Sequence, residues 1–375
     1  MKIVFTGGGT GGHFYPIIAV AQALNQLAAE RRLLAPSLYY LSDRPYDRTA
    51  LYENHLEFKK VGAGKLRRYF SFLNFFDFFK TGFGLITAVW KLYWLYPDLV
   101  FSKGGYSSVP VVWAARLLKI PVFVHESDSH PGRANTWAGK FAARVALSYP
   151  EAAAYFPATK TAVTGNPIRQ ELLSPITVGA YAFLRLEEGR PVIFITGGSQ
   201  GAQVINDALL DIVPDLLNRY QIVHQVGEAN LAEVEKRATF LLREHPHAKR
   251  YHAYATLNSD ALRMLAGITN LIITRAGSAL FEIAQWGIPA IIIPIPEPIS
   301  HDQRSNAFTY ARSGGAVVIE QNNLTSSVLR SEIDRLLGNK DLLEKMKQGA
   351  KSFARPNASR LIAEEIINLA VAHEA

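Results

Sequence analysis

The sequence predicts an α/β protein of two doubly wound domains, each with a parallel sheet covered by helices on both faces. The chain of 375 residues is long enough for two domains with separate hydrophobic cores. Short β-branched runs each end in a glycine turn and precede a helical pattern, which is the alternation typical of parallel sheets. This unit opens the chain and opens again at residue 191, so each half of the sequence predicts one domain.

The predicted strands are largely continuous apolar runs. They are residues 2–6, 38–41, 98–102, 122–124, 191–196 and 270–274. Residues 17–27, 202–217 and 278–286 repeat apolar side chains at helical spacing and predict helices. Continuous apolar strands are typical of parallel sheets, because such strands are buried on both faces.

A turn-rich segment at 163–169 marks the predicted domain boundary, since its Asn166-Pro167 pair disfavours a helix. We therefore expect an N-terminal domain of residues 1–164 and a C-terminal domain of residues 165–357. A C-terminal helix of residues 358–375, amphipathic over 358–372, is compatible with packing on either domain. Because ligands bind at the carboxyl ends of parallel strands, two facing domains would place their glycine loops around one interdomain cleft.

The composition narrows the range of partners and compartments. A formal net charge of +8 and a pI near 9.4 favour anionic partners. The absence of cysteine excludes disulfides and thiolate chemistry and suits a reducing compartment. The N-terminal apolar run is too short for a signal peptide, and no uncharged stretch approaches the roughly 18 residues that span a bilayer.

Two glycine loops follow predicted strands and precede predicted helices. Residues 7–12 match the Gly-x-Gly-x-x-Gly pattern, in which backbone N–H groups at a helix N-terminus can hold a phosphate. Asp43 leaves a dinucleotide-binding interpretation open, whereas His13 stands where a nucleotide-triphosphate loop needs lysine. Residues 197–202 form the second loop. Simple tight turns would also use these glycines, but two such loops fit a nucleotide–sugar donor in one domain and its acceptor in the other.

Motifs in both halves of the chain resemble those of the MurG family of UDP-N-acetylglucosamine:lipid I N-acetylglucosaminyltransferases. They are Gly7-Gly8-Gly9-Thr10-Gly11-Gly12-His13, Lys103-Gly104-Gly105-Tyr106, His125-Glu126, Gly165-Asn166-Pro167-Ile168-Arg169, Gly197-Gly198-Ser199-Gln200-Gly201-Ala202, Arg275-Ala276-Gly277 with Glu282, and Asp302-Gln303 with Asn306-Ala307. The resemblance implies a GT-B fold of two Rossmann-like domains. It also implies inverting transfer of N-acetylglucosamine from UDP-N-acetylglucosamine to the muramyl sugar of lipid I, which forms lipid II in peptidoglycan synthesis.

The resemblance also implies site residues. The donor side would comprise Arg169, Gly198, Ser199, Gln200, Glu282, Gln303 and Asn306, with the ribose on Glu282, the sugar hydroxyls on Gln303 and the uracil near residues 254–260. The acceptor side would comprise Thr10, Gly11, Gly12, Gly104, Gly105, Tyr106, His125 and Asn135. Without the resemblance, Glu282 would be an ordinary first-turn acid and His125 a satisfied strand-end histidine.

Transfer requires a base for the acceptor hydroxyl and stabilisation of the departing pyrophosphate. His13 is the first candidate for the base, because imidazole titrates near neutral pH; Asp128 and Glu126 are second candidates. The family often has Asn where this chain has Asp128. No Asp-x-Asp sequence occurs, so we expect no metal and no cofactor, with the glycine loops stabilising the leaving group.

Residues 65–96 predict contact with an anionic membrane beside an undecaprenyl-pyrophosphate-linked acceptor, on the cytoplasmic face. The segment holds twelve aromatic residues with Lys65, Arg67, Arg68, Lys80 and Lys91 against the single acid Asp77. An aromatic-rich pair of core helices is the other interpretation. No nucleic-acid partner is expected. A transferase acting on diacylglycerol, a nicotinamide oxidoreductase and a basic membrane- or nucleic-acid-binding module remain alternatives.

Overall fold

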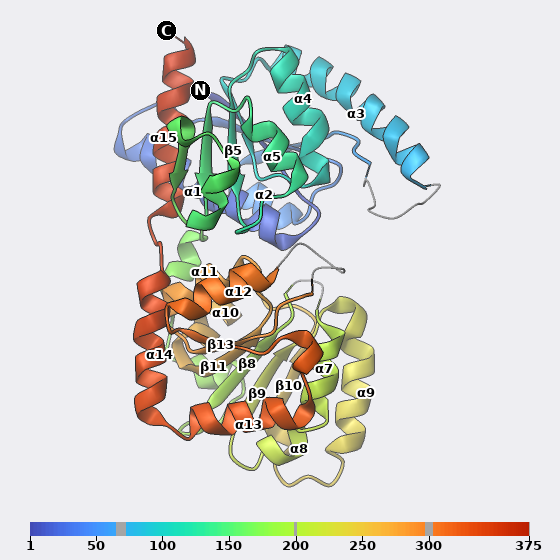
Figure 1. Ribbon diagram of the computed structural model, residues 1–375, viewed down its shortest axis with the longest axis vertical. Helices are drawn as coiled ribbons and strands as arrows, with labels where there is room; N and C mark the ends of the chain where they lie inside the picture. The colour runs from blue at the N-terminus through green and yellow to red at the C-terminus, as the bar shows by residue number, and fades with distance from the viewer. Residues whose placement is uncertain (65–72, 199–200, 297–302, 375) are drawn as a thin grey trace. The chain divides into compact units, whose positions relative to one another are not determined.

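The computed structural model describes residues 1–64, 73–198, 201–296 and 303–374 (Figure 1). The chain divides into two compact units, one of Met1–Gln170 with Arg355–Ala375 and one of Glu171–Ala354. The first crossing therefore lies after Gln170 rather than after Thr164, and the return crossing lies before Arg355 rather than before Ala358. Each unit is a doubly wound α/β domain, so the predicted fold class is confirmed.

The sheet of the first unit is entirely parallel, with strand order β3-β2-β1-β4-β5-β6-β7. Its strands are β1 (Lys2–Thr6), β2 (Ser37–Ser42), β3 (Leu56–Lys60), β4 (Leu99–Ser102), β5 (Val122–Glu126), β6 (Arg144–Leu147) and β7 (Thr161–Val163). The order reverses between β1 and β4. The loops that leave these two strands run in opposite directions, and such a switch point is where doubly wound sheets bind ligands.

Helices cover both faces of this sheet. They are α1 (Gly11–Glu30), α2 (Arg48–Glu53), α3 (Leu73–Leu95), α4 (Val109–Leu117), α5 (Arg133–Gly139) and α15 (Ala358–Glu374). Alternate β1 residues point to opposite cores: Ile3 and Phe5 pack with α1 and α15, whereas Val4 packs with α3 and α4. The C-terminal helix α15 thus completes the core of the first unit and lies against α1 (Figure 1).

The second unit repeats the plan with parallel strand order β10-β9-β8-β11-β12-β13. Its strands are β8 (Val192–Thr196), β9 (Gln221–Gln225), β10 (Tyr251–Tyr254), β11 (Thr269–Thr274), β12 (Ala290–Ile292) and β13 (Ala316–Val318). The switch point lies between β8 and β11. Ile193 and Ile195 face one core and Val192 and Phe194 the other, which explains the continuous apolar run.

The helices of the second unit are α6 (Ala180–Phe183), α7 (Gln203–Leu210), α8 (Val213–Leu216), α9 (Leu231–Leu241), α10 (Ser259–Ile268), α11 (Ala279–Trp286), α12 (Gln303–Arg312), α13 (Ser326–Leu337) and α14 (Lys340–Phe353). The sequence predicted one helix over 202–217, but the structure has α7 and α8 there. Pro214 sits in the first turn of α8, where its missing N–H costs no helical hydrogen bond, and a second helix begins. Among the described helices, none is both long and apolar enough to cross a membrane.

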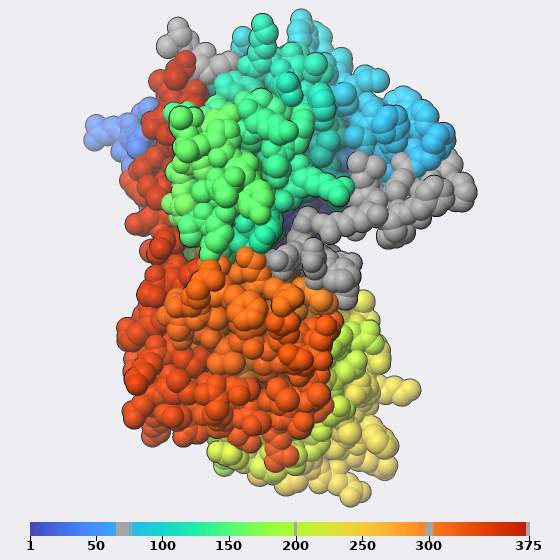
Figure 2. Space-filling view, in the orientation of Figure 1, coloured from blue at the N-terminus to red at the C-terminus, as the bar shows by residue number. Residues whose placement is uncertain are grey.

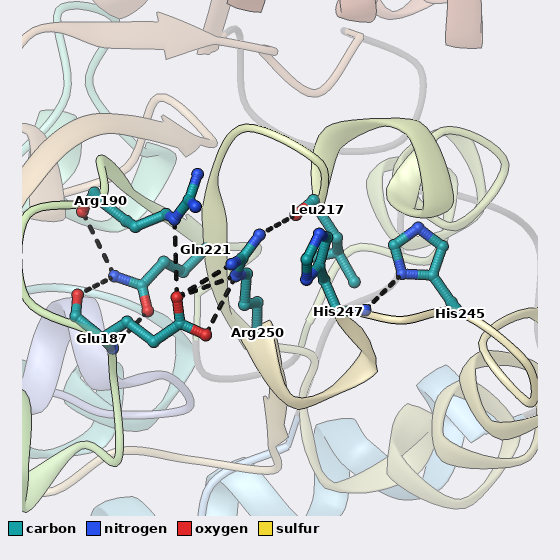
Figure 3. Close-up of polar contacts among 7 residues, drawn as sticks. All are labelled: Glu187, Arg190, Leu217, Gln221, His245, His247 and Arg250. Carbon is teal, nitrogen blue, oxygen red and sulfur yellow. Dashed lines mark hydrogen bonds and ion pairs between the residues drawn. The ribbon is translucent and has the colours of Figure 1, made fainter.

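A polar network lies at the amino end of the second sheet, opposite the carboxyl ends of its strands (Figure 3). Buried Arg250 donates from Nε to both carboxylate oxygens of Glu187 at 3.1 Å and from Nη1 to the Leu217 carbonyl at 2.9 Å. Gln221, the first residue of β9, donates to the Glu187 carbonyl at 2.7 Å and to the Arg190 carbonyl at 3.2 Å. A buried guanidinium needs such partners, and here they fix the loop before β8 to the start of β9.

Candidate active site

The first glycine loop joins β1 to α1 through a backbone that side chains would obstruct. Gly7, Gly8 and Gly9 all have positive φ, and a Cβ on Gly7 would lie 2.9 Å from the Lys103 Cβ. A Cβ on Gly8 would lie 2.9 Å from the Ser42 Oγ. The loop therefore packs against the ends of β4 and β2, and it brings the N-terminus of α1 to the switch point of the first sheet.

The first turn of α1 carries the predicted base. His13 is half-buried, and its Nδ1 lies 3.0 Å from the Thr10 Oγ1, which orients the ring. The same turn contains buried Gly11 and half-buried Gly12, and it has no acidic residue. Helix N–H groups that lack helical partners, without a competing carboxylate, make a turn suited to an anionic group beside an imidazole.

The loop after β4 lies against the first glycine loop. Gly104 and Gly105 have φ values of +79° and +80°, and a Cβ on Gly105 would lie 3.0 Å from the Gly8 carbonyl oxygen. Tyr106, beside Gly9, donates its hydroxyl to the Asp43 Oδ2 at 2.9 Å. The loops that follow β1, β2 and β4 thus form one packed surface at the carboxyl end of the sheet.

Glu126 holds the turn at 127–132. Its Oε1 accepts from the backbone N–H groups of Ser127 and Asp128 at 2.8 and 3.0 Å. Its Oε2 accepts from the Gly132 N–H at 3.1 Å and from the Asn135 Nδ2 at 2.9 Å. The carboxylate is buried, and burial raises its pKa. Four donors hold Glu126 as a support for the turn, while Asp128 on that turn is half-buried.

His125 is fully buried at the end of β5. Its Nε2 lies 3.0 Å from the Gly165 carbonyl, so this nitrogen carries the proton, and its Nδ1 accepts from the Lys103 Nζ at 2.6 Å. Burial and the neighbouring Lys103 hold the pKa of His125 well below its usual value. The neutral ring therefore links the loop after β4, through Lys103, to the backbone at Gly165. Asn135 is also buried and donates to the His125 carbonyl at 3.2 Å.

Lys103 is the residue of this site to which the sequence analysis gave no role. Only 1% of it is exposed, although it carries an ammonium group, and its Nζ contacts His125, Ser127 and Asn166. The available signal was its position, directly after an apolar strand and directly before two glycines. A residue placed there lies at the carboxyl end of a buried strand, where solvent is excluded.

Arg169 lies in the first unit and packs on α1. Its guanidinium carbon is 4.1 Å from the centroid of the Tyr15 ring, a cation–π contact. The next residue, Gln170, donates its N–H to the Gln22 Oε1 at 3.0 Å. Burial raises the pKa of Tyr15 to about 12, despite the opposing effect of Arg169. These contacts fasten the chain to α1 where it leaves the first unit, and a donor role for Arg169 stays a prediction.

The glycine loop of the second unit follows β8. Gly198 has a φ of +82°, and its N–H donates to the Thr196 Oγ1 at 3.1 Å. Gly201 has a φ of +74°, and a Cβ there would lie 2.0 Å from the Val226 carbonyl oxygen. The predicted donor residues Ser199 and Gln200 lie outside the described residues. The loop leads directly into the N-terminus of α7.

The remaining donor candidates lie around the carboxyl ends of β11 and β12. Glu282 is half-buried in the first turn of α11, which follows β11. Gln303 begins α12, and its Oε1 accepts from the Ile295 N–H at 3.3 Å. Buried Asn306 donates to the Ala276 carbonyl at 3.1 Å, which ties α12 to the turn before α11. Across the described ranges, no group of three His, Asp or Glu side chains could hold a metal ion.

Family models match both units of the chain. A model of the glycosyltransferase family 28 N-terminal domain matches residues 3–147, and a model of the C-terminal domain of that family matches residues 192–362.

Similar sequences carry one name, UDP-N-acetylglucosamine–N-acetylmuramyl-(pentapeptide) pyrophosphoryl-undecaprenol N-acetylglucosamine transferase. The relative from Treponema denticola is 39% identical, over 84% of this chain and 83% of its own length. The relative from Treponema pallidum is 36% identical, over 97% of this chain and 94% of its own length. A relative from Bacillus cereus, whose name ends in the number 2, is 34% identical over 97% of this chain and 99% of its own length.

Solved structures share the fold. The crystal structure of Acinetobacter baumannii MurG is 26% identical with a TM-score of 0.71, over 98% of this chain and 99% of that one. The MnaA–UDP co-structure from S. aureus has a TM-score of 0.72 over 98% of both chains, and at 16% identity it bears on the fold alone. The fold is the GT-B fold expected from the sequence.

Two glycines of the donor loop provide a matched test of its packing. Gly198→Ala and Gly201→Ala both place a Cβ on a left-handed backbone, which costs about 1–2 kcal/mol. Among the described residues, no atom lies within 4 Å of a Cβ added at Gly198, whereas Gly201→Ala must also displace the Val226 carbonyl. We expect thermal unfolding to show the lower Tm for Gly201→Ala. Equal Tm values would contradict the close approach of this loop to Val226.

Proposed function

Because the chain belongs to the MurG family within glycosyltransferase family 28, we propose that it moves N-acetylglucosamine from UDP-N-acetylglucosamine to the muramyl sugar of lipid I, forming lipid II for peptidoglycan synthesis. The observation that carries this proposal is identity of 34–39% to relatives of that name over 84–97% of the chain. The comparisons favour neither a diacylglycerol acceptor nor an oxidoreductase.

The donor would bind the second unit. The pyrophosphate would lie against the Gly198 loop and the N-terminus of α7, where backbone N–H groups can offset the charge that grows on the departing UDP. Glu282 would accept hydrogen bonds from the ribose hydroxyls, since an ionised carboxylate accepts from two donors at once. Gln303 and Asn306, both attached by hydrogen bonds to loops after β11 or β12, would contact the sugar.

The acceptor would bind the first unit, with its pyrophosphate at the first turn of α1 and the loop at Gly104. His13 would remove the proton from the attacking hydroxyl, because Thr10 orients its ring and it is only half-buried. Glu126 is less suited to this step, since both of its oxygens hold the turn at 127–132. Asp128 is the second candidate.

Sugar transfer is the direct test of the function. We expect radiolabel to move from UDP-N-acetylglucosamine to lipid I but not to diacylglycerol. We also expect the reaction to continue in excess chelator, as the missing Asp-x-Asp sequence predicts. Transfer to diacylglycerol alone would replace the proposed acceptor, and loss of activity in chelator with recovery in magnesium would reveal a metal site.

Glu282→Ala tests the donor site separately. Loss of a charged hydrogen-bond partner of the ribose should weaken UDP binding by about 1–3 kcal/mol in calorimetry. Asp341→Ala is the matched control, because Asp341 is also a first-turn acid of a helix in the second unit. If both variants bind UDP as the wild type does, the ribose contact lies elsewhere.

Helix α3 supports the proposed membrane contact. Gly84, Ala88 and Leu92 form a buried stripe at four-residue spacing. A Cβ on Gly84 would lie 1.7 Å from the Gly62 carbonyl oxygen, so this stripe packs closely. Other large apolar side chains of this helix (light blue in Figure 2) are each between 51% and 72% exposed: Phe75, Phe78, Phe79, Phe83, Ile86, Trp90, Tyr93 and Trp94.

Such a surface is typical of proteins that bind a membrane interface or a partner. Exposed Lys80 and half-buried Lys91 lie on the same helix, and the Lys91 Nζ donates to the Lys60 carbonyl at 2.7 Å. The remaining predicted cations Lys65, Arg67 and Arg68 lie outside the described residues. We propose that α3 inserts its aromatic side chains among anionic lipids at the cytoplasmic face, where a nucleotide–sugar and a lipid-linked acceptor meet. The positive charge of the protein would serve this surface rather than nucleic acid.

The double variant Trp90→Ser/Trp94→Ser tests the membrane contact. Burial of one large apolar side chain contributes about 1.5–3 kcal/mol, so loss of two should weaken vesicle binding at least tenfold. Phe240→Ser is the control, since Phe240 is 80% exposed on α9 in the second unit. Co-sedimentation with vesicles, with and without anionic lipid, gives the measurement. Unchanged pelleting of the double variant would exclude α3 as the contact.

A further inference from the structure

The first unit buries an ammonium group whose contacts match its charged form. The Lys103 Nζ lies 2.6 Å from the His125 Nδ1 and 3.2 Å from the Asn166 Oδ1, and it donates to the Ser127 Oγ. An ammonium has three N–H donors, and these are three acceptors. A neutral amine would turn its lone pair toward one of them. The hydrogen bonds therefore favour the charged form, although burial lowers the pKa of Lys103.

The carboxylate of Glu126 has complementary surroundings. Its oxygens face only donors, three backbone N–H groups and the Asn135 amide, and a protonated acid would point its own hydrogen at one of them. These contacts favour the ionised form against the effect of burial. A second carboxylate, Asp128, lies close enough to raise the pKa of Glu126 and of Lys103. Two acidic side chains thus lie near one buried ammonium group.

Among the described residues, Lys103 makes no direct ion pair, so it acts on the two acids through space and through the loop that it holds. Ser127 is the residue between Glu126 and Asp128, and Lys103 contacts its hydroxyl. His125, which precedes Glu126, accepts from Lys103 and donates to the Gly165 carbonyl. One ammonium group therefore connects the ends of β4 and β5 with the segment that leaves the first unit.

We propose that Lys103 is a positioning residue for the transfer reaction: its buried positive charge stabilises the Glu126 carboxylate beside Asp128 and so holds the turn at 127–132 in the form that meets the acceptor. It does not touch the substrate. The link to catalysis rests on the proposed function, whereas the stabilisation of the Glu126 carboxylate by Lys103 does not.

Two kinetic results are expected of Lys103→Met. The turnover number should fall at least tenfold, while the KM for UDP-N-acetylglucosamine stays within about twofold, since the donor binds the other unit. The acid limb of the pH–kcat profile should move to higher pH, because a carboxylate that loses a nearby cation takes up its proton more readily. The ionisable groups around Lys103 are His125, Glu126 and Asp128, with His13 acting on His125.

Arg250→Met is the matched control. It removes another buried cation, from the network in Figure 3, and should lower the Tm without moving the pH profile. Ser127→Ala removes one acceptor of Lys103 but keeps the charge, so its acid limb should stay in place. A Lys103→Met enzyme with wild-type turnover and an unmoved acid limb would overturn the proposal.

A stability measurement separates this proposal from the proposed function. Asp128→Asn should raise the Tm in the Lys103→Met background, where it relieves repulsion with Glu126, and should not raise it in the wild type. This coupling needs no activity, so it also decides the case where Lys103→Met folds poorly. If the wild type transfers no sugar to lipid I, the proposed function is wrong, but the Tm coupling between Lys103 and Asp128 still tests the electrostatic role of Lys103. Absence of coupling overturns the role of Lys103 even in an active enzyme.

Discussion

The loops at the carboxyl end of the first sheet are held by two buried charged groups, Lys103 and Glu126, whose polar atoms are hydrogen-bonded. Removing an ammonium or a carboxylate from water costs several kcal/mol for each ion, so such groups persist only where nearly every donor and acceptor has a partner. Lys103 and Glu126 meet this condition through neutral groups on the ends of β4 and β5. The loops cannot shift without leaving one of these charges unpaired, and this restricts the surface available to an acceptor.

Close backbone approach is the second constraint, and both units use it at the carboxyl ends of their strands. In the first unit Gly8 and Gly105 allow the loops after β1 and β4 to touch. In the second unit Gly201 lies against the Val226 carbonyl, which joins the loop after β8 to the loop after β9. In each case a missing Cβ lets two loops from adjacent strands form one surface. The parallel strands bring these loops to one edge of each sheet, and the glycines let neighbouring loops pack together.

The sequence predicted the features that depend on local pattern. The β1 prediction at 2–6 is confirmed to the residue, because a short apolar run that ends in a glycine turn is typical of a strand buried on both faces. The division of 202–217 into α7 and α8 was missed, since apolar periodicity continues across Asp211 and Ile212 while the helix does not. Helical spacing records which face is buried and not whether the backbone is continuous.

Contacts between residues far apart in the sequence could not be predicted, for a different reason. From the sequence alone, His125 could line the acceptor site or be a satisfied core residue. Its contacts, the Gly165 carbonyl at one ring nitrogen and Lys103 at the other, show that it is buried and neutral. Arg169 follows a turn that suggested the donor domain, yet its side chain packs on Tyr15. These partners lie 40, 22 and 154 residues away (165 − 125, 125 − 103 and 169 − 15), where no local pattern reports on them.

Helix α3 shows how stability and function separate within one element. Its buried stripe of Gly84, Ala88 and Leu92 packs in the first unit, and the missing Cβ of Gly84 allows a close approach to the Gly62 carbonyl. The exposed aromatic side chains of α3 lie outside this buried stripe. Exposed aromatic rings are unfavourable in water, and a fold selected only for stability would place polar residues there. Their presence on α3 is the reason to propose an apolar surface outside the protein, and for a lipid-linked substrate that surface would be the membrane that carries it.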